Sequence, residues 1–242
     1  MNIAGLIKRA VNWMRGIASV HGILLPVDRN VLSPRMELTL ASGKYETRER
    51  VLSTRIVHAG DVVLELGAGL GFVGSYLRKF TKAGKIICIE ANPRLIPYIN
   101  TVHELNSVDN VEVLNGVAIP GYRQARTLPF YCRTDFWASS LDDAAPYDTV
   151  VHVRSLSFPE ILEQHRPDVL IMDIEGGELD LLSAPSAGSI RAIVLETHPR
   201  VYGADGVRAV EANLARLGFV EDPHGADRVV RTFVRTPSAA AR

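Results

Sequence analysis

The chain has 242 residues, in which 27 Lys and Arg balance 27 Asp and Glu and give a pI of about 7.1. This length suits one large α/β domain with at most a small extension. The balanced charge gives no overall attraction to nucleic acid, so we expect no nucleic-acid partner. The two cysteines, Cys88 and Cys132, supply neither a disulfide framework nor a metal-ligand spacing, which favours a cytoplasmic protein.

Apolar residues recur at helical spacing over residues 3–18, which predicts an amphipathic helix. The uncharged stretch GIASVHGILLPV has no small-x-small cleavage site, and no run is long enough to span a bilayer. Residues 1–45, with a loop that holds Pro26 and Pro34, are therefore predicted to be an N-terminal helical extension. Its apolar face would pack on the domain or on a second copy of the chain in a homo-oligomer. A role at a membrane surface or with another partner is the alternative, although three basic residues are few for binding anionic lipid.

Residues 46–236 are predicted to form one domain in which strands and helices alternate, after a first helix that ends near Gly60. We expect strands near 61–66, 85–90, 111–115, 168–174 and 190–196. We expect helices near 72–81, 93–106, 157–165, 176–184 and 206–217. This alternation predicts a parallel sheet. The segments GFVED and DRVVRTFVR would form a hairpin at its edge, before a frayed tail at 237–242.

Residues 119–155 interrupt the alternation, because this segment is rich in turn residues and has only short extended runs. We interpret it as an insertion in a crossover. Such insertions often form a wall of a substrate pocket, and the alternative is a plain elaboration of the surface.

The segment DVVLELGAGLGFVGSYL combines a buried strand, three alternating glycines and the start of a helix. Small residues let a backbone pass close to a ligand and leave the helix N-terminal amides free. Gly67, Ala68, Gly69 and Gly71 are therefore predicted to bind a nucleotide-like cofactor.

The register of the glycines favours S-adenosylmethionine over a dinucleotide. Gly69, Gly71 and Gly74 formally satisfy the G-x-G-x-x-G pattern. In the dinucleotide fingerprint, however, the first glycine closely follows the strand, and the set that begins at Gly67 has Phe72 where the third glycine should stand.

Two carboxylates support the same cofactor. Glu65, at the end of the first strand, would repel a pyrophosphate but suits the ammonium and sulfonium groups of S-adenosylmethionine. Glu90 ends the next strand, 21 residues beyond Gly69, where it can accept hydrogen bonds from ribose hydroxyls.

Four segments follow one another along the chain, namely ELGAGLG, IEANP, DIEGGELDLL and IVLETHP. With these segments in this order, the chain resembles the FkbM-type family of S-adenosylmethionine-dependent methyltransferases. The resemblance runs from about Gly43 to Phe219, and DIEGGELDLL and ETHP are its most specific parts. It implies a Rossmann-like class I methyltransferase fold, with a seven-stranded, mostly parallel sheet whose last strand is antiparallel. It also implies O-methylation of a hydroxyl on a small molecule such as a sugar or a secondary metabolite.

Three residues are candidates for catalysis. Asp173 follows a buried strand at the edge where ligands collect in open α/β sheets, so it is predicted to contact the cofactor and to orient or deprotonate the acceptor. Glu175 either contacts the substrate beside Asp173 or stabilises the start of the next helix. His198, which follows Glu196 on the neighbouring strand, is either a general base or a packing residue.

Further contacts are predicted from position along the chain. The cofactor set also includes Ala91, Asn92, Asn115, Gly116 and Val117, and the substrate set is Tyr45, Ser139, Ser140 and Glu196. Asp173, Glu175, Glu196 and His198 could together hold a metal ion, but no tight ligand spacing supports one, so none is predicted.

Two other functions stay open. A nicotinamide-dependent (NAD(P)) reductase or epimerase is disfavoured by the register of the glycine loop and by the lack of a Tyr-x-x-x-Lys pair. The other is a catalytically inactive cofactor-binding module that acts in an assembly through its N-terminal helix.

Overall fold

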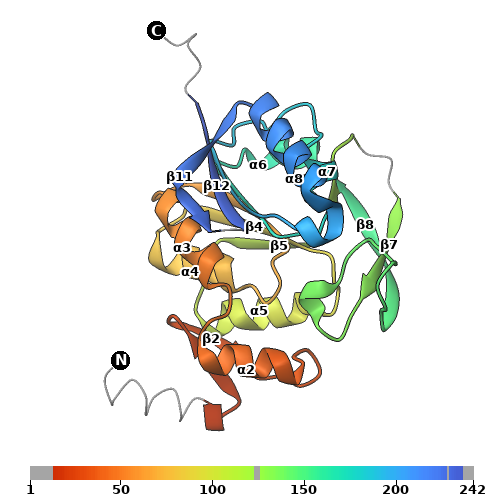
Figure 1. Cartoon of the computed structure of the whole chain (residues 1–242). Coiled ribbons are helices and arrows are strands. Elements are labelled where there is room, and N and C mark those ends of the chain that lie inside the picture. Colours follow the sequence, from red (N-terminus) through yellow and green to blue (C-terminus); the bar gives the residue numbers. More distant parts are fainter. Residues whose placement is uncertain (1–12, 123–125, 228, 237–242) are drawn as a thin grey trace.

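The computed structural model describes residues 13–122, 126–227 and 229–236 (Figure 1). Its central sheet has seven strands in the order β11-β12-β10-β9-β3-β4-β5. These strands are β3 (Val62–Leu66), β4 (Lys85–Glu90), β5 (Val111–Asn115), β9 (Val169–Met172), β10 (Ala192–Glu196), β11 (Phe219–Asp227) and β12 (Val230–Arg235). The strands from β10 to β5 pair in parallel, and β12 is antiparallel to both of its neighbours. This is the predicted Rossmann-like class I methyltransferase fold.

Helices cover both faces of this sheet (Figure 1). One face carries α3 (Thr47–Ile56), α4 (Phe72–Phe80) and α5 (Leu95–Leu105), and the other carries α6 (Phe158–His165), α7 (Glu178–Leu181) and α8 (Pro199–Arg216). The predicted strands and helices are confirmed to within a few residues, although α7 is shorter than expected and α8 begins earlier. No helix in the described ranges has the length and apolar character needed to cross a bilayer.

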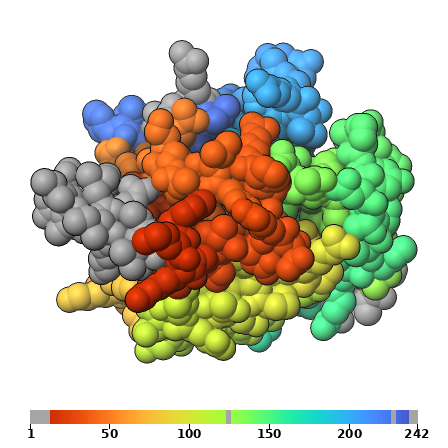
Figure 2. Space-filling model, turned by 90° about the horizontal axis from the view of Figure 1, so that it is seen from below, coloured from red at the N-terminus to blue at the C-terminus, as the bar shows by residue number. Residues whose placement is uncertain are grey.

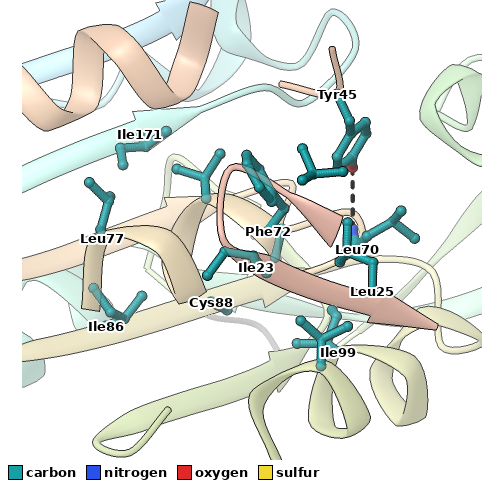
Figure 3. Close-up of a cluster of buried hydrophobic side chains, with 14 of the residues drawn as sticks. Ile23, Leu25, Tyr45, Leu70, Phe72, Leu77, Ile86, Cys88, Ile99 and Ile171 are labelled. Atoms are coloured by element: carbon teal, nitrogen blue, oxygen red, sulfur yellow. Dashed lines mark hydrogen bonds between the residues drawn. The ribbon is translucent and has the colours of Figure 1, made fainter. Parts of the chain in front are cut away.

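Alternate residues of each central strand enter opposite cores, as expected for a parallel sheet buried on both faces. In β3, Val63 packs under α3 and α4, whereas Leu64 and Leu66 pack under the other helix layer. Figure 3 shows the first core, in which Leu77 of α4 lies near Ile86 and Ile171 of the sheet, and Phe72 of α4 lies near Ile23. Because side chains alternate along a strand, Glu65 lies on the same face as Val63.

The N-terminal segment differs from the prediction. From Ile17 onward the chain forms a hairpin of β1 (Ile17–Val20) and β2 (Ile23–Pro26), so the predicted helix over 3–18 is wrong there, and residues 1–12 lie outside the described residues. The hairpin turn consists of His21 and Gly22, both with positive φ, as a type I′ two-residue turn requires.

Helix α2 (Pro34–Ser42) occupies part of the predicted loop. Ser33 accepts a hydrogen bond from the Met36 amide at its start, and Gly43 ends it with φ 71°. This is a typical capped helix, with Pro at the first turn. The hairpin and α2 share the core of α3–α5, and Figure 2 shows these red and orange segments spread over that face of the molecule.

The segment predicted to be an insertion forms a small sheet of its own. Its strands β6 (Val117–Ile119), β8 (Thr149–Ser157) and β7 (Thr127–Cys132) lie in the order β6-β8-β7. A loop after β7 carries the short helix η1 (Phe136–Ala138). Strand β8 has nine residues and is therefore longer than the short extended runs expected from the sequence.

The C-terminal hairpin is confirmed, with β11 at the edge and β12 between β11 and β10. The predicted frayed tail, residues 237–242, lies outside the described residues.

Candidate active site

A cavity of about 1440 Å³ lies at the carboxyl ends of β3, β4, β9 and β10. The strand order reverses between β3 and β9, and open α/β sheets bind ligands at such a point. The loop before α3, helix α2 and the small sheet with η1 form the other walls. The fold therefore places one large site where the predicted functional residues converge.

The glycine loop forms part of the cavity floor. Gly67 has φ 81°, and a Cβ built on it would lie 1.8 Å from the carbonyl oxygen of Asp173. That oxygen belongs to the backbone and cannot rotate away, so only glycine fits at this position. Gly67 and Gly69 both line the cavity, whereas Gly71 is the N-cap of α4 with φ 72°, and a Cβ on it would lie 2.9 Å from Ile99.

Glu90 ends β4 and faces the same cavity. Its two carboxylate oxygens accept hydrogen bonds from the backbone amides of Gly69, at 2.9 Å, and Asn92, at 2.8 Å. Burial raises the pKa of Glu90 to about 7, although these amide hydrogen bonds act in the opposite direction. A carboxylate has about four acceptor positions, so the geometry leaves some of them for a ribose diol.

Glu65 does not line the cavity, contrary to the cofactor contact predicted for it. Its side chain lies between β3 and α4, where Oε2 is 3.1 Å from Cys88 Sγ and would be 2.5 Å from a Cβ on Gly74. Burial raises the pKa of Glu65 to about 7. The sequence pattern could not show that the Glu65 side chain faces away from the cavity. Leu66, not Glu65, is the last residue of strand β3.

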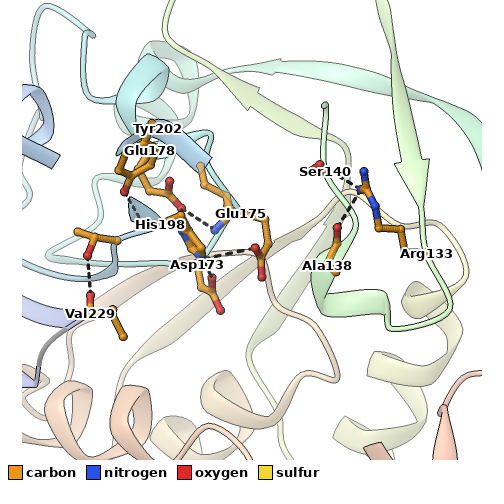
Figure 4. A network of polar contacts seen from close by, with 11 residues as sticks. Arg133, Ala138, Ser140, Asp173, Glu175, Glu178, His198, Tyr202 and Val229 are labelled. Carbon is orange, nitrogen blue, oxygen red and sulfur yellow. Dashed lines mark hydrogen bonds and ion pairs between the residues drawn. The ribbon is translucent and has the colours of Figure 1, made fainter. Parts of the chain in front are cut away.

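Acidic side chains surround one histidine at the ends of β9 and β10 (Figure 4). His198 Nε2 lies 3.4 Å from Asp173 Oδ1 and 3.5 Å from Glu175 Oε2. Glu196 belongs to the same group, and it is hydrogen-bonded to Glu49 of α3. Asp173, Glu175 and Glu196 line the cavity, and the His198 side chain lies behind them, 11% exposed.

Two buried groups hold His198 in place. Its Nδ1 lies 3.1 Å from Oε1 of Glu178, whose side chain is 0% exposed. The same oxygen accepts a hydrogen bond from the amide of Ile174, and the His198 amide donates to the Tyr202 hydroxyl at 2.7 Å. Glu178 therefore does more than stabilise the first turn of α7, because it fixes the orientation of the imidazole.

The charges at this cluster are strongly coupled. Burial alone would lower the pKa of His198, but the hydrogen bond and charge of Glu178, with the charges of Asp173 and Glu175, raise it to about 9. Burial, followed by repulsion from Glu196, raises the pKa of Asp173 well above its ordinary value. In the protein alone, His198 is therefore a charged partner of the carboxylates at neutral pH.

The loop before α3 covers the glycine loop. The Tyr45 hydroxyl is hydrogen-bonded to Glu46 and accepts from the Leu70 amide at 3.5 Å. Glu46 adopts φ 43°, a conformation that non-glycine residues rarely take and that often marks functional sites. Burial raises the pKa of Glu46 well above its ordinary value.

The structure brings most of the predicted site residues together. Those that line the cavity are Tyr45, Gly67, Gly69, Glu90, Ala91, Gly116, Val117, Ser139, Asp173, Glu175 and Glu196. Those set back from its surface are Glu65, Ala68, Gly71, Asn92, Asn115, Ser140 and His198. The Asn92 and Asn115 side chains serve the backbone nearby, since Asn92 Oδ1 accepts from the Arg94 amide and Asn115 donates to the carbonyls of Glu90 and Ala91. Their roles, like those of the lining residues, stay predictions.

Sequence reasoning missed a second group of lining residues. It comprises Arg35, Met36, Thr39, Lys44, Arg48 and Glu49 from the N-terminal part, and Phe136 and Trp137 from η1. The only available signal was general, namely that irregular segments before and after the glycine loop often form the walls of a pocket.

A family model for the TRM5/TYW2 methyltransferase domain matches residues 36–118. This region runs from α2 to β6 and includes the glycine loop and Glu90. A search of curated proteins finds no match.

Solved structures resemble the chain at low sequence identity. TYW2 of M. jannaschii in complex with AdoMet is 15% identical, with 91% of this chain and 86% of that chain covered and a TM-score of 0.46. Trm5b of Pyrococcus abyssi is 18% identical, with 90% of this chain and 53% of that chain covered and a TM-score of 0.47. Precorrin-6y C5,15-methyltransferase of Geobacter metallireducens is 17% identical, with 80% and 89% covered and a TM-score of 0.47.

These findings correct two predictions. The resemblance to the FkbM-type family was wrong, because the family model that matches is that of TRM5/TYW2. The match to the TRM5/TYW2 methyltransferase domain also overturns the expectation of a small-molecule substrate and no nucleic acid. The family was misidentified because the segments DIEGGELDLL and ETHP, which lie outside the matched region, were given too much weight. Nucleic acid was excluded as a partner because the net charge of the chain is balanced.

The predicted cofactor and enzyme class are confirmed. The matched domain is a methyltransferase domain, and the strand order is that of class I methyltransferases. The residues present also fit S-adenosylmethionine, because the glycine loop exposes its backbone, Glu90 retains acceptor positions, and the cavity exceeds the volume of one small ligand. When bound, this cofactor supplies an activated methyl group. The chain is an S-adenosylmethionine-dependent methyltransferase.

Proposed function

We propose that the chain methylates a nucleotide of RNA, most directly of tRNA, and that the target base enters the cavity described above. The observation that carries this proposal is the match of residues 36–118 to the TRM5/TYW2 methyltransferase domain, whose members act on tRNA. The site geometry supports it in three ways.

First, the cavity has room for more than a cofactor. Its volume of about 1440 Å³ is above the usual range of about 300–1,000 Å³ for a single ligand pocket. Enzymes that modify a base must take it out of its stack and hold it in a pocket. The extra volume is therefore consistent with a cofactor and one nucleotide side by side.

Second, the cavity lining carries both basic and acidic side chains. Arg35, Lys44 and Arg126 contribute basic side chains, whereas Asp173, Glu175 and Glu196 lie at the strand ends. Phosphates favour the basic groups, and the N–H donors on the edge of a base favour carboxylates. A nucleotide can satisfy both regions at once, with its phosphate at the basic side and its base toward Asp173.

Third, aromatic rings are available for stacking. Trp137 and Phe136 line the cavity, and the Arg35 guanidinium lies 5.5 Å from the centre of the Trp137 ring. RNA-binding proteins hold unpaired bases by stacking them on aromatic rings and on guanidinium planes. In this arrangement Asp173, at the end of β9, is the residue placed to orient or deprotonate the acceptor atom.

The test is transfer of a labelled methyl group from S-adenosylmethionine. We expect label to enter unmodified tRNA transcripts and not a panel of hydroxylated small molecules. Trp137→Ala should raise the RNA concentration needed for half-maximal transfer at least about 5-fold, because base stacking contributes about 1–3 kcal/mol. Trp13→Ala is the matched control, since Trp13 lies outside the cavity lining. Label in the small molecules alone would contradict the proposal, as would equal effects of the two variants.

A further inference from the structure

We infer that Asp173, Glu196 and His198 form a binding site for one divalent transition-metal ion at the sheet end of the cavity. Each of these residues offers one ligand atom, and the three atoms lie within 4.8 Å of one another. The inference concerns the protein itself and does not depend on whether the methyl acceptor is RNA.

The fold places the three ligands together from two neighbouring parallel strands. Asp173 directly follows β9, Glu196 is the last residue of β10, and His198 comes two residues later. Ligand bonds to such ions are about 2.0–2.2 Å long, so ligand atoms around one ion lie about 3–4 Å apart. The separation of 3.4 Å between His198 Nε2 and Asp173 Oδ1 already meets this requirement, and small side-chain rotations bring in Glu196.

One of the ligand atoms lacks a hydrogen-bond partner. Asp173 Oδ1 is fully buried and accepts no hydrogen bond from the described residues. His198 Nε2 lies 3.4 Å from this oxygen, which is an ion-pair distance and longer than an ordinary hydrogen bond. Buried acceptors are rarely left unsatisfied, because desolvation costs about 1–3 kcal/mol. A metal ion between Oδ1 and Nε2 would satisfy both atoms.

The histidine is held as metal-binding histidines usually are. Its Nδ1 faces the buried carboxylate of Glu178 at 3.1 Å, which directs Nε2 toward Asp173. A ligating histidine almost always donates its second N–H to a carboxylate or a carbonyl, and this bond fixes its tautomer and orientation. The backbone amide of Ile174 holds the same Glu178 oxygen, so the supporting group is itself fixed.

The ligand set indicates which ions fit. One imidazole and two carboxylates suit Mn²⁺ or Zn²⁺ better than Mg²⁺, which prefers oxygen ligands alone. Three protein ligands also leave coordination positions open, as in catalytic rather than structural metal sites. Because Asp173 and Glu196 line the cavity, those positions face it, where water or a substrate oxygen would complete the coordination.

Calorimetry with chelator-treated full-length protein tests the inference. Titration with Mn²⁺ and, separately, Zn²⁺ should show one saturable site for at least one of the two ions. Glu196→Gln and His198→Gln should weaken binding at least about 10-fold, and Glu178→Gln by about 10–100-fold, the usual effect of losing a supporting carboxylate. Asp180→Asn is the matched control, because Asp180 is an exposed acid of the same cavity outside the ligand set.

Several results would overturn the inference. They are the absence of saturable binding by either ion, wild-type affinity in Glu196→Gln, or equal weakening by Asp180→Asn, which would indicate general attraction to acidic groups. Circular dichroism identifies any variant that fails to fold. If Mn²⁺ is bound, electron spin-echo spectroscopy of the wild-type protein then decides, since a coordinated imidazole gives a nitrogen coupling and its absence contradicts the site. If only Zn²⁺ is bound, an unchanged Zn²⁺ affinity in His198→Gln contradicts it. These readouts require neither RNA nor cofactor, so they can fail while the proposed function stands.

Discussion

Replacing Gly67 by alanine tests whether close packing between β3 and β9 builds the site. The added Cβ would lie 1.8 Å from the Asp173 carbonyl oxygen, so one of the two strand ends must move. Two costs arise, which are about 1–2 kcal/mol for a Cβ in the left-handed region and about 1–3 kcal/mol for overpacking. We expect Gly67→Ala to lower the free energy of unfolding by about 2–5 kcal/mol.

Gly60→Ala is the control that separates these two costs. Gly60 has φ 89°, close to the 81° of Gly67, but a Cβ there meets no atom within 4 Å. Only the conformational cost then remains, about 1–2 kcal/mol, partly offset by the lower entropy of the unfolded chain. Urea unfolding measures both variants, and calorimetry with S-adenosylmethionine shows whether Asp173 and the loop have moved. Equal destabilisation by the two substitutions would refute the packing argument.

Three further predictions follow from the site. Glu90→Gln should weaken S-adenosylmethionine binding by about 10–100-fold, because hydrogen bonds to a charged group contribute about 1.5–3 kcal/mol; an unchanged Kd in calorimetry would remove Glu90 from the cofactor site. The pKa of Glu65 is raised from 4.5 to about 7 by burial, so the folded state binds this proton more tightly than the unfolded state. Its stabilising contribution is complete below about pH 4.5 and is lost as the pH rises through about 7, by up to about 3 kcal/mol. Urea unfolding at about pH 5 and about pH 8 should therefore show a smaller difference in Glu65→Gln than in the wild type, and identical differences would contradict the assignment. Arg133 donates hydrogen bonds to the carbonyls of Ala138, Asp142, Ala145 and Pro146, which a lysine cannot reproduce because it lacks the planar guanidinium. Arg133→Lys should make residues 133–148 more sensitive to limited proteolysis, whereas an unchanged cleavage rate would show that these bonds do not order the loop.

The central sheet was predictable because its signals are local. Apolar runs such as VVLEL and KIICIE are typical of strands buried on both faces, and the helices between them have regular apolar spacing. Asp173 and Glu90 were placed correctly at strand ends, since the carboxyl ends of parallel strands meet at one edge.

The errors arose where local patterns compete. Ile17 fits the helical spacing of residues 3–18, but it also begins the alternation of IASV and ILLP around a His-Gly turn. A two-residue turn ending in glycine was an available hairpin signal, and it outweighs the helical pattern in the structure. Glu65 was misplaced for a related reason, because a shift of one residue along a strand reverses the face of the side chain.

The role of Glu178 could not be predicted from the sequence at all. Its first-turn position is typical of an acid that stabilises a helix start. Its hydrogen bond to His198 joins residues 20 positions apart, and only the packing of α7 against the start of α8 brings them together.

Nucleoside analysis of tRNA tests whether the chain methylates a nucleotide of RNA. Unmodified tRNA transcripts would be incubated with the protein and S-adenosylmethionine, digested to nucleosides and examined by mass spectrometry. We expect one nucleoside to gain the mass of a methyl group, this gain to require the cofactor, and Asp173→Asn to abolish it while the variant remains folded. RNA without any methylated nucleoside, from a protein that binds S-adenosylmethionine and methylates a small hydroxylated molecule under the same conditions, would contradict the proposed function.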